Sequence, residues 1–203
     1  MRKRVGKEPD KDLYDYKVRC LQELEALSQQ GKIDLYYGDE TGVSTEGYCP
    51  YGWQGKEEKV SVAALPISRQ RLNCFGCISR SNQFYHATSK EAINGKFIVG
   101  QLEAFSTQIS RPTFVVLDNA RIHKTKEIQK RYEAWQRKGL YIFYLPPYSP
   151  HLNIAETLWR VMKGRWLQVK DYLSADTLFD ATHKYLAEVG NKRSINYGSF
   201  NIN

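Results

Sequence analysis

Three acidic side chains, far apart in the sequence, have the types and surroundings expected of a metal-dependent phosphoryl-transfer site. Asp39 closes the apolar run IDLYYGD, Asp118 closes TFVVLD, and Glu156 lies within SPHLNIAETLWRVMKGRW. Mg²⁺ and Mn²⁺ take oxygen ligands, and three carboxylates are enough to hold two such ions. A pair of ions about 3.5–4 Å apart activates an attacking water or 3′-hydroxyl and stabilises the leaving oxygen. Glu40 neighbours Asp39 in a strand and must point to the opposite face, so we expect Glu40 to support the site rather than bind metal.

Two of these acids could instead have a purely structural role. Asp118 and the Asn119 that follows it are residues typical of a turn at the end of a strand. Glu156 lies three residues after Asn153, so its carboxylate fits a capping box that accepts the Asn153 backbone N–H. The local sequence leaves both alternatives open, and only the joint placement of the three acids favours metal-dependent cleavage and transfer of DNA strands.

Basic residues gather around two of the acids. The chain of 203 residues carries 30 Lys and Arg against 22 Asp and Glu, a formal net charge of +8. Residues 111–170 hold twelve of the basic and four of the acidic side chains, and the rest of the chain is balanced. Such an excess favours a polyanionic partner, although single Lys and Arg side chains are usually only solvated. The basic side chains that flank the acids, and that we predict to contact DNA phosphates, are Arg121, Lys124, Lys126, Arg160, Lys163 and Arg165.

The four cysteines, Cys20, Cys49, Cys74 and Cys77, are expected to be reduced thiols. Only Cys74 and Cys77 form a CxxC, and no second pair or neighbouring His completes a zinc site. Strand alternation places these two thiols on opposite faces. No apolar run approaches the roughly 20 residues of a membrane span, and residues 1–12 lack the apolar core of a signal peptide. The sequence thus predicts a protein of a reducing, cytoplasmic compartment with no membrane partner.

The first thirty residues predict an amphipathic helix that packs on the core. Its apolar positions recur at steps of three and four, and are Leu13, Tyr16, Cys20, Leu24 and Leu27. Gly31 ends this helix, so residues 1–32 are expected to form a helical extension of a domain that spans residues 33–203. The next segments predict an antiparallel meander, with strands at 33–39, 57–67 and 71–79. In the Gly-rich turn between the first two, Trp53 either stacks on a base or packs on the sheet.

After residue 89 the spacing of the apolar residues changes, and it predicts helices that alternate with strands. The predicted elements are a helix over 92–105, a strand over 113–118, a helix over 125–138 ended by Gly139, and a strand over 140–145. Strand, helix, strand implies parallel pairing, and the unbroken apolar run LYIFYL is typical of a strand covered on both faces. A last strong helix starts at the N-cap Asn153, with an apolar stripe of Leu152, Trp159, Met162 and Trp166. We therefore predict an α/β fold with a mixed sheet flanked by helices.

Three segments of the chain together resemble a known family. The segments YYGDETGVS, FVVLDNARIHKT and LPPYSPHLNIAETLW are similar to the signature blocks of mariner-like transposases, in their bacterial insertion-sequence branch. The resemblance runs from about residue 33 to about residue 170. It implies a DDE endonuclease domain with an RNase H-like fold, in which Asp39, Asp118 and Glu156 are the catalytic ligands of two Mg²⁺ or Mn²⁺ ions. It also implies cut-and-paste movement of an insertion sequence, and a protein of the bacterial cytoplasm that is associated with the nucleoid.

Other residues of these blocks are expected to shape the site. Asn119, His123 and Asn153 match polar residues of the family, and the resemblance implies that they position the acids rather than bind metal. His123 by itself is more typical of a satisfied surface or core histidine. His151 and Ile154 replace an acid and a proline that many relatives carry, and neither change removes an expected metal ligand.

The resemblance also implies partners, namely double-stranded DNA of the transposon ends and of the target, and a homodimer on paired ends. Full-length relatives carry helix-turn-helix modules that recognise the terminal repeats, whereas about thirty residues precede the first catalytic strand here. We therefore expect a separately encoded recognition part, a catalytic fragment or a truncated copy. Two other functions stay open: an RNase H-like nuclease for RNA–DNA hybrids or branched DNA, and a non-catalytic remnant that binds DNA or another subunit.

Overall fold

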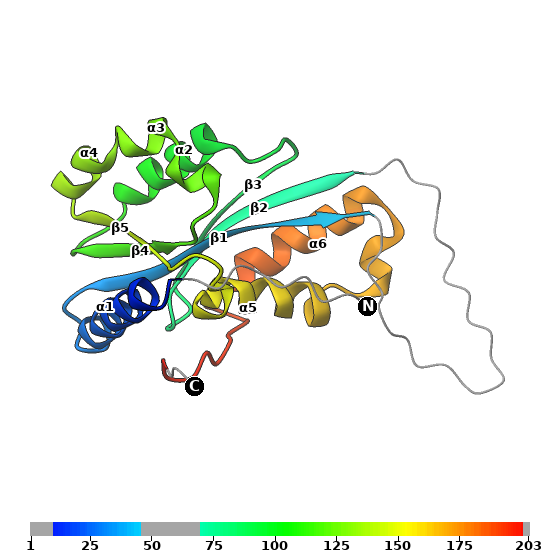
Figure 1. The fold of residues 1–203 in the computed structure, drawn as a ribbon. Helices are drawn as coiled ribbons and strands as arrows, with labels where there is room; N and C mark the ends of the chain where they lie inside the picture. Colours follow the sequence, from blue (N-terminus) through cyan, green and yellow to red (C-terminus); the bar gives the residue numbers. More distant parts are fainter. Residues whose placement is uncertain (1–9, 46–69, 201–203) are drawn as a thin grey trace.

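A mixed sheet forms the centre of the protein (Figure 1). The computed structural model describes residues 10–45 and 70–200, so the predictions for Cys49, Trp53 and a strand at 57–67 lie outside the described residues. In the described part five strands pair in the order β3-β2-β1-β4-β5. They are β1 (Asp34–Ser44), β2 (Arg71–Ile78), β3 (Phe84–Ser89), β4 (Thr113–Leu117) and β5 (Leu140–Tyr144).

The sheet begins antiparallel and continues parallel, as the sequence predicts. β1 pairs antiparallel with β2, and β2 pairs antiparallel with β3. On its other side β1 pairs parallel with β4, which in turn pairs parallel with β5. The carboxyl ends of β4 and β5 therefore lie together, beside the middle of the longer strand β1.

Helices cover both faces of the sheet (Figure 1). One face carries α2 (Gly95–Ser106), the 3₁₀ turn η1 (Arg121–Lys124), α3 (Lys126–Gln129) and α4 (Tyr132–Arg137). The other carries α1 (Lys11–Gln29), α5 (Ile154–Val161) and α6 (Ala175–Glu188). Short helical turns surround α5, namely η2 (Pro150–Leu152), the π-helical η3 (Met162–Trp166) and η4 (Val169–Leu173). None of the described helices is long and apolar enough to cross a bilayer.

Each face of the sheet has its own apolar core. Leu21, Tyr37 and Leu158 belong to the core under α1, α5 and α6, and Ile98 and Trp135 belong to the core under α2 and α4. The two thiols of β2 are free, and they divide between these cores, with Cys74 in the first and Cys77 in the second. The predicted alternation of the two thiols is thus confirmed.

The first helix forms where the sequence predicts it, and the second half of its predicted stripe faces the core. Leu24 is buried and Leu27 packs against the same core, whereas Leu13 and Tyr16 are 42% and 56% exposed. In the first half of the helix Val18 and Leu21 are buried instead, so the predicted face is wrong there. The helix ends before Gly31, which has a φ of +70° that favours glycine.

Glu25 is buried and joins three segments of the fold. Its carboxylate accepts hydrogen bonds from the Tyr37 hydroxyl and from Arg80 Nε, the latter at 2.6 Å. Arg80 Nη1 also donates to the backbone oxygens of Tyr197 and Gly198. A buried carboxylate is tolerated when it is paired and hydrogen-bonded in this way. The network holds α1, the β2–β3 turn and the C-terminal segment together.

Three further predictions of local structure need correction. β1 continues to Ser44, where the sequence suggests a turn from residue 41, because residues 41–44 pair with β2. The helix predicted over 125–138 is interrupted, and only its stop before Gly139 (φ +86°) is as expected. β5 is half-buried over 141–144 rather than covered on both faces, because it is an edge strand with a neighbour on one side only. In addition, β3 forms from FYHATS, to which the sequence pattern assigned no element.

Candidate active site

Parallel pairing of β1 and β4 brings the first two acids together. Tyr37 of β1 is in register with Val116 of β4. Asp39 and Asp118 each follow two residues later, so Asp118, just past the carboxyl end of β4, lies beside Asp39 in the middle of β1. Asp39 is 9% exposed, and Asp118, just after the end of β4, is half-buried.

The third acid comes from the first turn of α5. Asn153 is the N-cap of α5, since its side chain accepts a hydrogen bond from Ala155 N–H. The Asn153 backbone N–H donates to the Pro150 oxygen at 2.9 Å, so it is not available to Glu156. The capping-box interpretation of Glu156 is therefore wrong. Its carboxylate is exposed, and it lies close enough to Asp39 to affect the ionisation of that residue.

Asp39 is the electrostatic centre of the site. Burial raises the pKa of Asp39 to about 8, and the neighbouring carboxylates of Glu156, Glu40 and Asp118 add to this effect. Like charges that share a site disfavour one another's ionised forms. The ionised form of Asp39 is thus disfavoured, and a cation bound beside it would favour that form.

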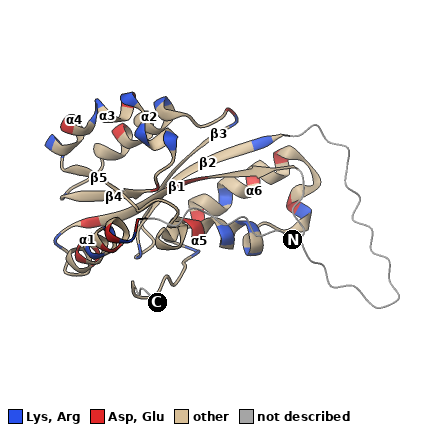
Figure 2. Ribbon diagram, viewed as in Figure 1, with Lys and Arg blue, Asp and Glu red and all other residues tan. Residues whose placement is uncertain are grey.

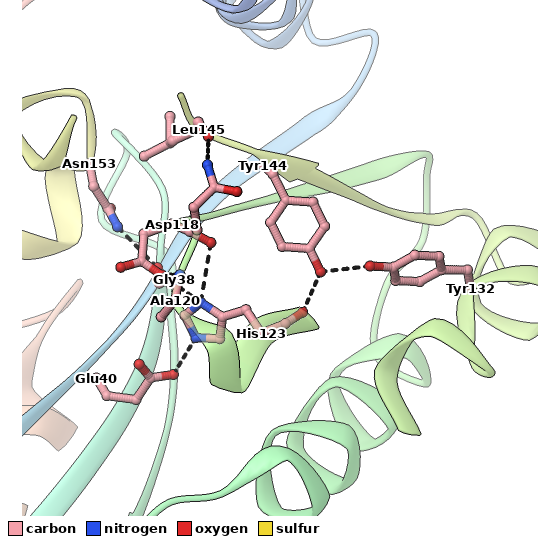
Figure 3. A network of polar contacts seen from close by, with 10 residues as sticks. Gly38, Glu40, Asp118, Ala120, His123, Tyr132, Tyr144, Leu145 and Asn153 are labelled. Atoms are coloured by element: carbon pink, nitrogen blue, oxygen red, sulfur yellow. Dashed lines mark hydrogen bonds and ion pairs between the residues drawn. The ribbon is translucent and has the colours of Figure 1, made fainter. Parts of the chain in front are cut away.

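Glu40 and Asp118 are linked by a buried histidine (Figure 3). His123 Nδ1 donates to Asp118 Oδ1, and His123 Nε2 donates to Glu40 Oε1, both at 2.7 Å. Burial by itself would lower the pKa of His123, but these two hydrogen bonds and the charges of both acids raise it to about 10. Burial would likewise raise the pKa of Asp118, but hydrogen bonds from His123 and from Ala120 N–H keep it below its ordinary value. At neutral pH His123 is therefore a buried cation that holds β1 and η1 together.

The remaining polar residues of the sequence blocks fix the backbone beside the acids (Figure 3). Asn119 Nδ2 donates to the Leu145 oxygen, and Asn153 Nδ2 donates to the Gly38 oxygen at 3.1 Å. The Tyr144 hydroxyl donates to the His123 backbone oxygen. All four residues expected to shape the site therefore lie beside the acids. His123 bonds to Asp118 and Glu40, Asn153 bonds to the backbone next to Asp39, and Asn119 ties the backbone next to Asp118 to Leu145.

Nothing in the local sequence indicates that Glu40 and His123 are partners. These residues are 83 positions apart, and their hydrogen bond depends on where η1 folds against β1. Thr41 was also overlooked: it is 8% exposed, lies on the same face of β1 as Asp39, and accepts a hydrogen bond from Lys163 Nζ at 2.8 Å. Strand alternation places Thr41 on the same face as Asp39, and this alternation is the sequence feature that points to Thr41 as a neighbour of the site.

The basic side chains predicted to contact DNA are all exposed, and they flank the acids in two groups. The first lies on η1 and α3, and the second on α5 and the π-helical turn that follows it; Lys and Arg positions on these elements are blue in Figure 2. Lys163 is tied to Thr41, and Lys124 Nζ lies 5.2 Å from the centre of the Tyr144 ring. Both groups are thus attached to elements that carry or neighbour the acids.

The donor set suits a hard divalent cation, although the carboxylates have not closed on one. Among residues 10–45 and 70–200, no three His, Cys, Asp or Glu side chains are arranged so that they hold a metal ion. Carboxylate oxygens are nevertheless the ligands that Mg²⁺ and Mn²⁺ prefer. Burial above all, and the nearby carboxylates in addition, raise the pKa of Asp39, so a cation bound there would favour its ionised form. The residues therefore fit the metal in chemistry and charge.

Comparison with known proteins gives a family match and a shared fold. Residues 34–179 match the family model of the DDE superfamily endonucleases, while no curated protein matches the sequence. The crystal structure of the Mos1 strand transfer complex is similar with a TM-score of 0.62 and 14% identity, covering 92% of this chain and 58% of that chain. The catalytic domain of Mos1 mariner transposase gives a TM-score of 0.55 and 12% identity, covering 91% and 85%. The intasome of simian T-cell lymphotropic virus gives 0.52 and 15%, covering 82% and 51%.

Mos1 mariner paired-end complexes with Mn and with Mg are similar as well, each with a TM-score of 0.60 and 14% identity. They cover 92% of this chain, which spans 60% and 59% of their chains, less than two thirds of their length. The mixed five-stranded sheet with flanking helices is the RNase H-like fold of these transposases and integrase cores. The predicted fold class is confirmed.

Proposed function

Because this chain belongs to the DDE superfamily of endonucleases, we propose that it is the catalytic domain of a transposase that cleaves DNA at the ends of a mobile element and joins them to a target. The proposal depends above all on one observation: the pairing of β1 with β4 places Asp39 beside Asp118, and the Asn153 hydrogen bond to the Gly38 oxygen holds the start of α5, with Glu156, beside the same strand. Structural proteins avoid such an arrangement because it costs free energy, whereas a site that binds cations needs it. The bacterial insertion-sequence branch stays a prediction from the sequence blocks.

Asp39, Asp118 and Glu156 are the proposed metal ligands and catalytic residues. When bound, two Mg²⁺ or Mn²⁺ ions activate the attacking water or 3′-hydroxyl and stabilise the leaving oxygen of the phosphodiester. The fold similarity to Mos1 complexes with Mn and with Mg supports this choice of ions. The two-ion count follows from the number of carboxylates.

The surrounding residues prepare the acids for this role. His123 and Ala120 N–H occupy Asp118 Oδ1 and leave Oδ2 without a hydrogen bond to any described residue. Asn153 fixes the start of α5, and with it Glu156, against the Gly38 backbone. Preorganised groups of this kind lower the reorganisation needed when a charged substrate arrives.

DNA is the proposed substrate, and a pair of copies on two ends is the proposed assembly. Arg160, Lys163 and Arg165 extend from the acids along α5 and η3, and Arg121, Lys124 and Lys126 lie on the other side of the site. Lys and Arg neutralise phosphates and position the duplex. The similarity to Mos1 paired-end complexes supports paired assembly.

A nicking assay tests the proposal. Wild-type protein with Mn²⁺ should nick supercoiled plasmid, and Asp39→Asn, Asp118→Asn and Glu156→Gln should each lose this activity by more than about 100-fold, as expected for groups that act only on the reacting centre. Asp34→Asn is the matched control, since Asp34 lies at the far end of β1 in an ion pair with Arg111. Its nicking should equal wild type.

Substrate comparison separates the remaining functions. Preference for an RNA–DNA hybrid or a four-way junction over duplex ends would favour an RNase H-like nuclease. Full nicking by all three acid variants would refute the site. A wild-type protein that binds DNA without nicking in Mn²⁺ or Mg²⁺ would instead indicate a non-catalytic remnant.

A further inference from the structure

The loop between β5 and α5, residues 145–153, is anchored at both ends to the strands that carry the acids. At one end, Leu145 N–H donates to the Leu117 oxygen at 2.9 Å, and the Leu145 oxygen accepts from Asn119. At the other, the buried Asn153 side chain donates to the Gly38 oxygen. The position of this loop relative to Asp39 and Asp118 is therefore fixed by hydrogen bonds.

One side chain of this loop points away from the protein. Pro146, Ser149 and Leu152 are buried, but Tyr148 between them is 66% exposed. Its ring makes no hydrogen bond, ring contact or cation–π contact with the residues that the structure describes. An exposed tyrosine is thus held on a rigid support beside the proposed active site.

The backbone of Tyr148 is also in an unfavourable conformation. Its φ is +58°, in the left-handed region where a Cβ atom is strained and where Gly or Asn is usual. The other non-glycine residue with positive φ in the described part is Asn82, whose side chain has a structural reason, two hydrogen bonds to the Ile195 backbone. Tyr148 has no such compensating contact. A strained backbone conformation that no local contact compensates is typical of functional positions.

On the premise of the proposed function, we propose that the Tyr148 ring stacks on an unpaired nucleobase of the DNA next to the scissile phosphate. Aromatic rings bind bases through their faces, which every base presents once it is out of the helical stack. The loop sequence LPPYSPHLN contains no acidic side chain that would repel the phosphates. Since both ends of the loop are attached beside the acids, a base on this ring lies close to the reacting phosphate.

A fluorescent base tests this proposal directly. The probe is a forked duplex with 2-aminopurine at its first unpaired position, studied in Ca²⁺, which takes the same oxygen ligands. Wild type and Tyr148→Phe should quench the probe, and Tyr148→Ala and Tyr148→Gly should not. The two latter variants should bind the fork about 5- to 150-fold more weakly, yet bind a blunt duplex as wild type does.

Two controls keep the result specific. Tyr16→Ala removes a tyrosine of similar exposure, 56%, from α1, and should leave quenching and affinity unchanged. Tyr148→Gly permits the positive φ, so a melting temperature equal to wild type shows that the loop is folded in the variant that fails to stack.

Three outcomes would overturn the stacking site. One is equal quenching by wild type and Tyr148→Ala, another is an equal loss of affinity for fork and blunt duplex, and the third is a change in self-association without a change in quenching. The last would identify Tyr148 as a contact between protein copies. Plasmid nicking is measured separately. If wild type nicks the plasmid and Tyr148→Ala still quenches the probe normally, only the stacking site is refuted. If wild type does not nick, the proposed function is refuted.

Discussion

Replacing Asp39 with Asn should stabilise the cation-free protein by an amount that grows with pH. Burial and three neighbouring carboxylates raise the pKa of Asp39 to about 8, from an ordinary value of 3.8. A group with a raised pKa in the folded state favours folding fully below its unfolded pKa, and this contribution is lost as pH rises through the folded pKa. At about 1.36 kcal/mol per pH unit above 3.8, the loss reaches about 4 kcal/mol at pH 7. Asn does not titrate and avoids this loss.

Thermal melting in EDTA, from about pH 4 to about pH 9, measures the difference. A chain of this size shifts its melting temperature by about 2–4 °C per kcal/mol. The gap between Asp39→Asn and wild type should therefore open from near zero at about pH 4 to about 8–16 °C at pH 7, and stop growing above about pH 8. All other titrating groups are common to both proteins, so the gap reports Asp39.

Saturating Mn²⁺ or Mg²⁺ should close most of this gap. Binding of a cation to the folded state stabilises it by mass action, about 2.7 kcal/mol at a concentration of 100 times Kd. Wild type should therefore gain more from the cation than Asp39→Asn does. Asp34→Asn, on the same strand but paired with Arg111 at 3.6 Å, should show the wild-type pH profile and the full cation shift.

Two separate results would contradict this account of Asp39. A gap that stays constant with pH would mean that the pKa of Asp39 is not raised in the folded protein. A cation shift of equal size in wild type and Asp39→Asn would mean that Asp39 is not a ligand, whatever the pH profile.

Three further predictions concern the surroundings of the site. His123→Ala leaves Glu40 and Asp118 without their shared partner, and should lower the free energy of unfolding, measured in urea, by about 3 kcal/mol. This value is at the lower end for a buried ion pair because the Asp118 side chain is 47% exposed. A decrease below about 1 kcal/mol, typical of surface ion pairs, would contradict the bridge. Arg80→Ala leaves Glu25 buried and unpaired, and should cost about 3–5 kcal/mol and expose the C-terminal segment to limited proteolysis. Lys163→Gln should weaken duplex binding at all sequences and reduce the salt slope of the affinity by about 1, whereas Lys192→Gln, exposed in the C-terminal turn, should not.

Local pattern was a good guide where a single element decides the outcome. The apolar runs before Asp39 and Asp118 predicted strands, and these are β1 and β4. Asn153 was identified as a cap from residue type alone, because an Asn before an apolar helical stripe satisfies free N–H groups. Pattern was a poor guide where packing between elements decides: Leu13 and Tyr16 share the apolar period of Leu24 and Leu27, yet it is Val18 and Leu21 that pack on the core in the first half of α1.

The sequence by itself determined the types of the three acids, the strands and helix that carry them, and the mixed order of the sheet, because side-chain periodicity and capping depend on the backbone within a few residues. Only the tertiary structure decided that Asp39 holds its proton at neutral pH, that His123 bridges Glu40 and Asp118, and that Tyr148 points into solvent from an anchored loop. These properties arise from burial and from contacts between segments far apart in the chain, and neither is encoded in local spacing.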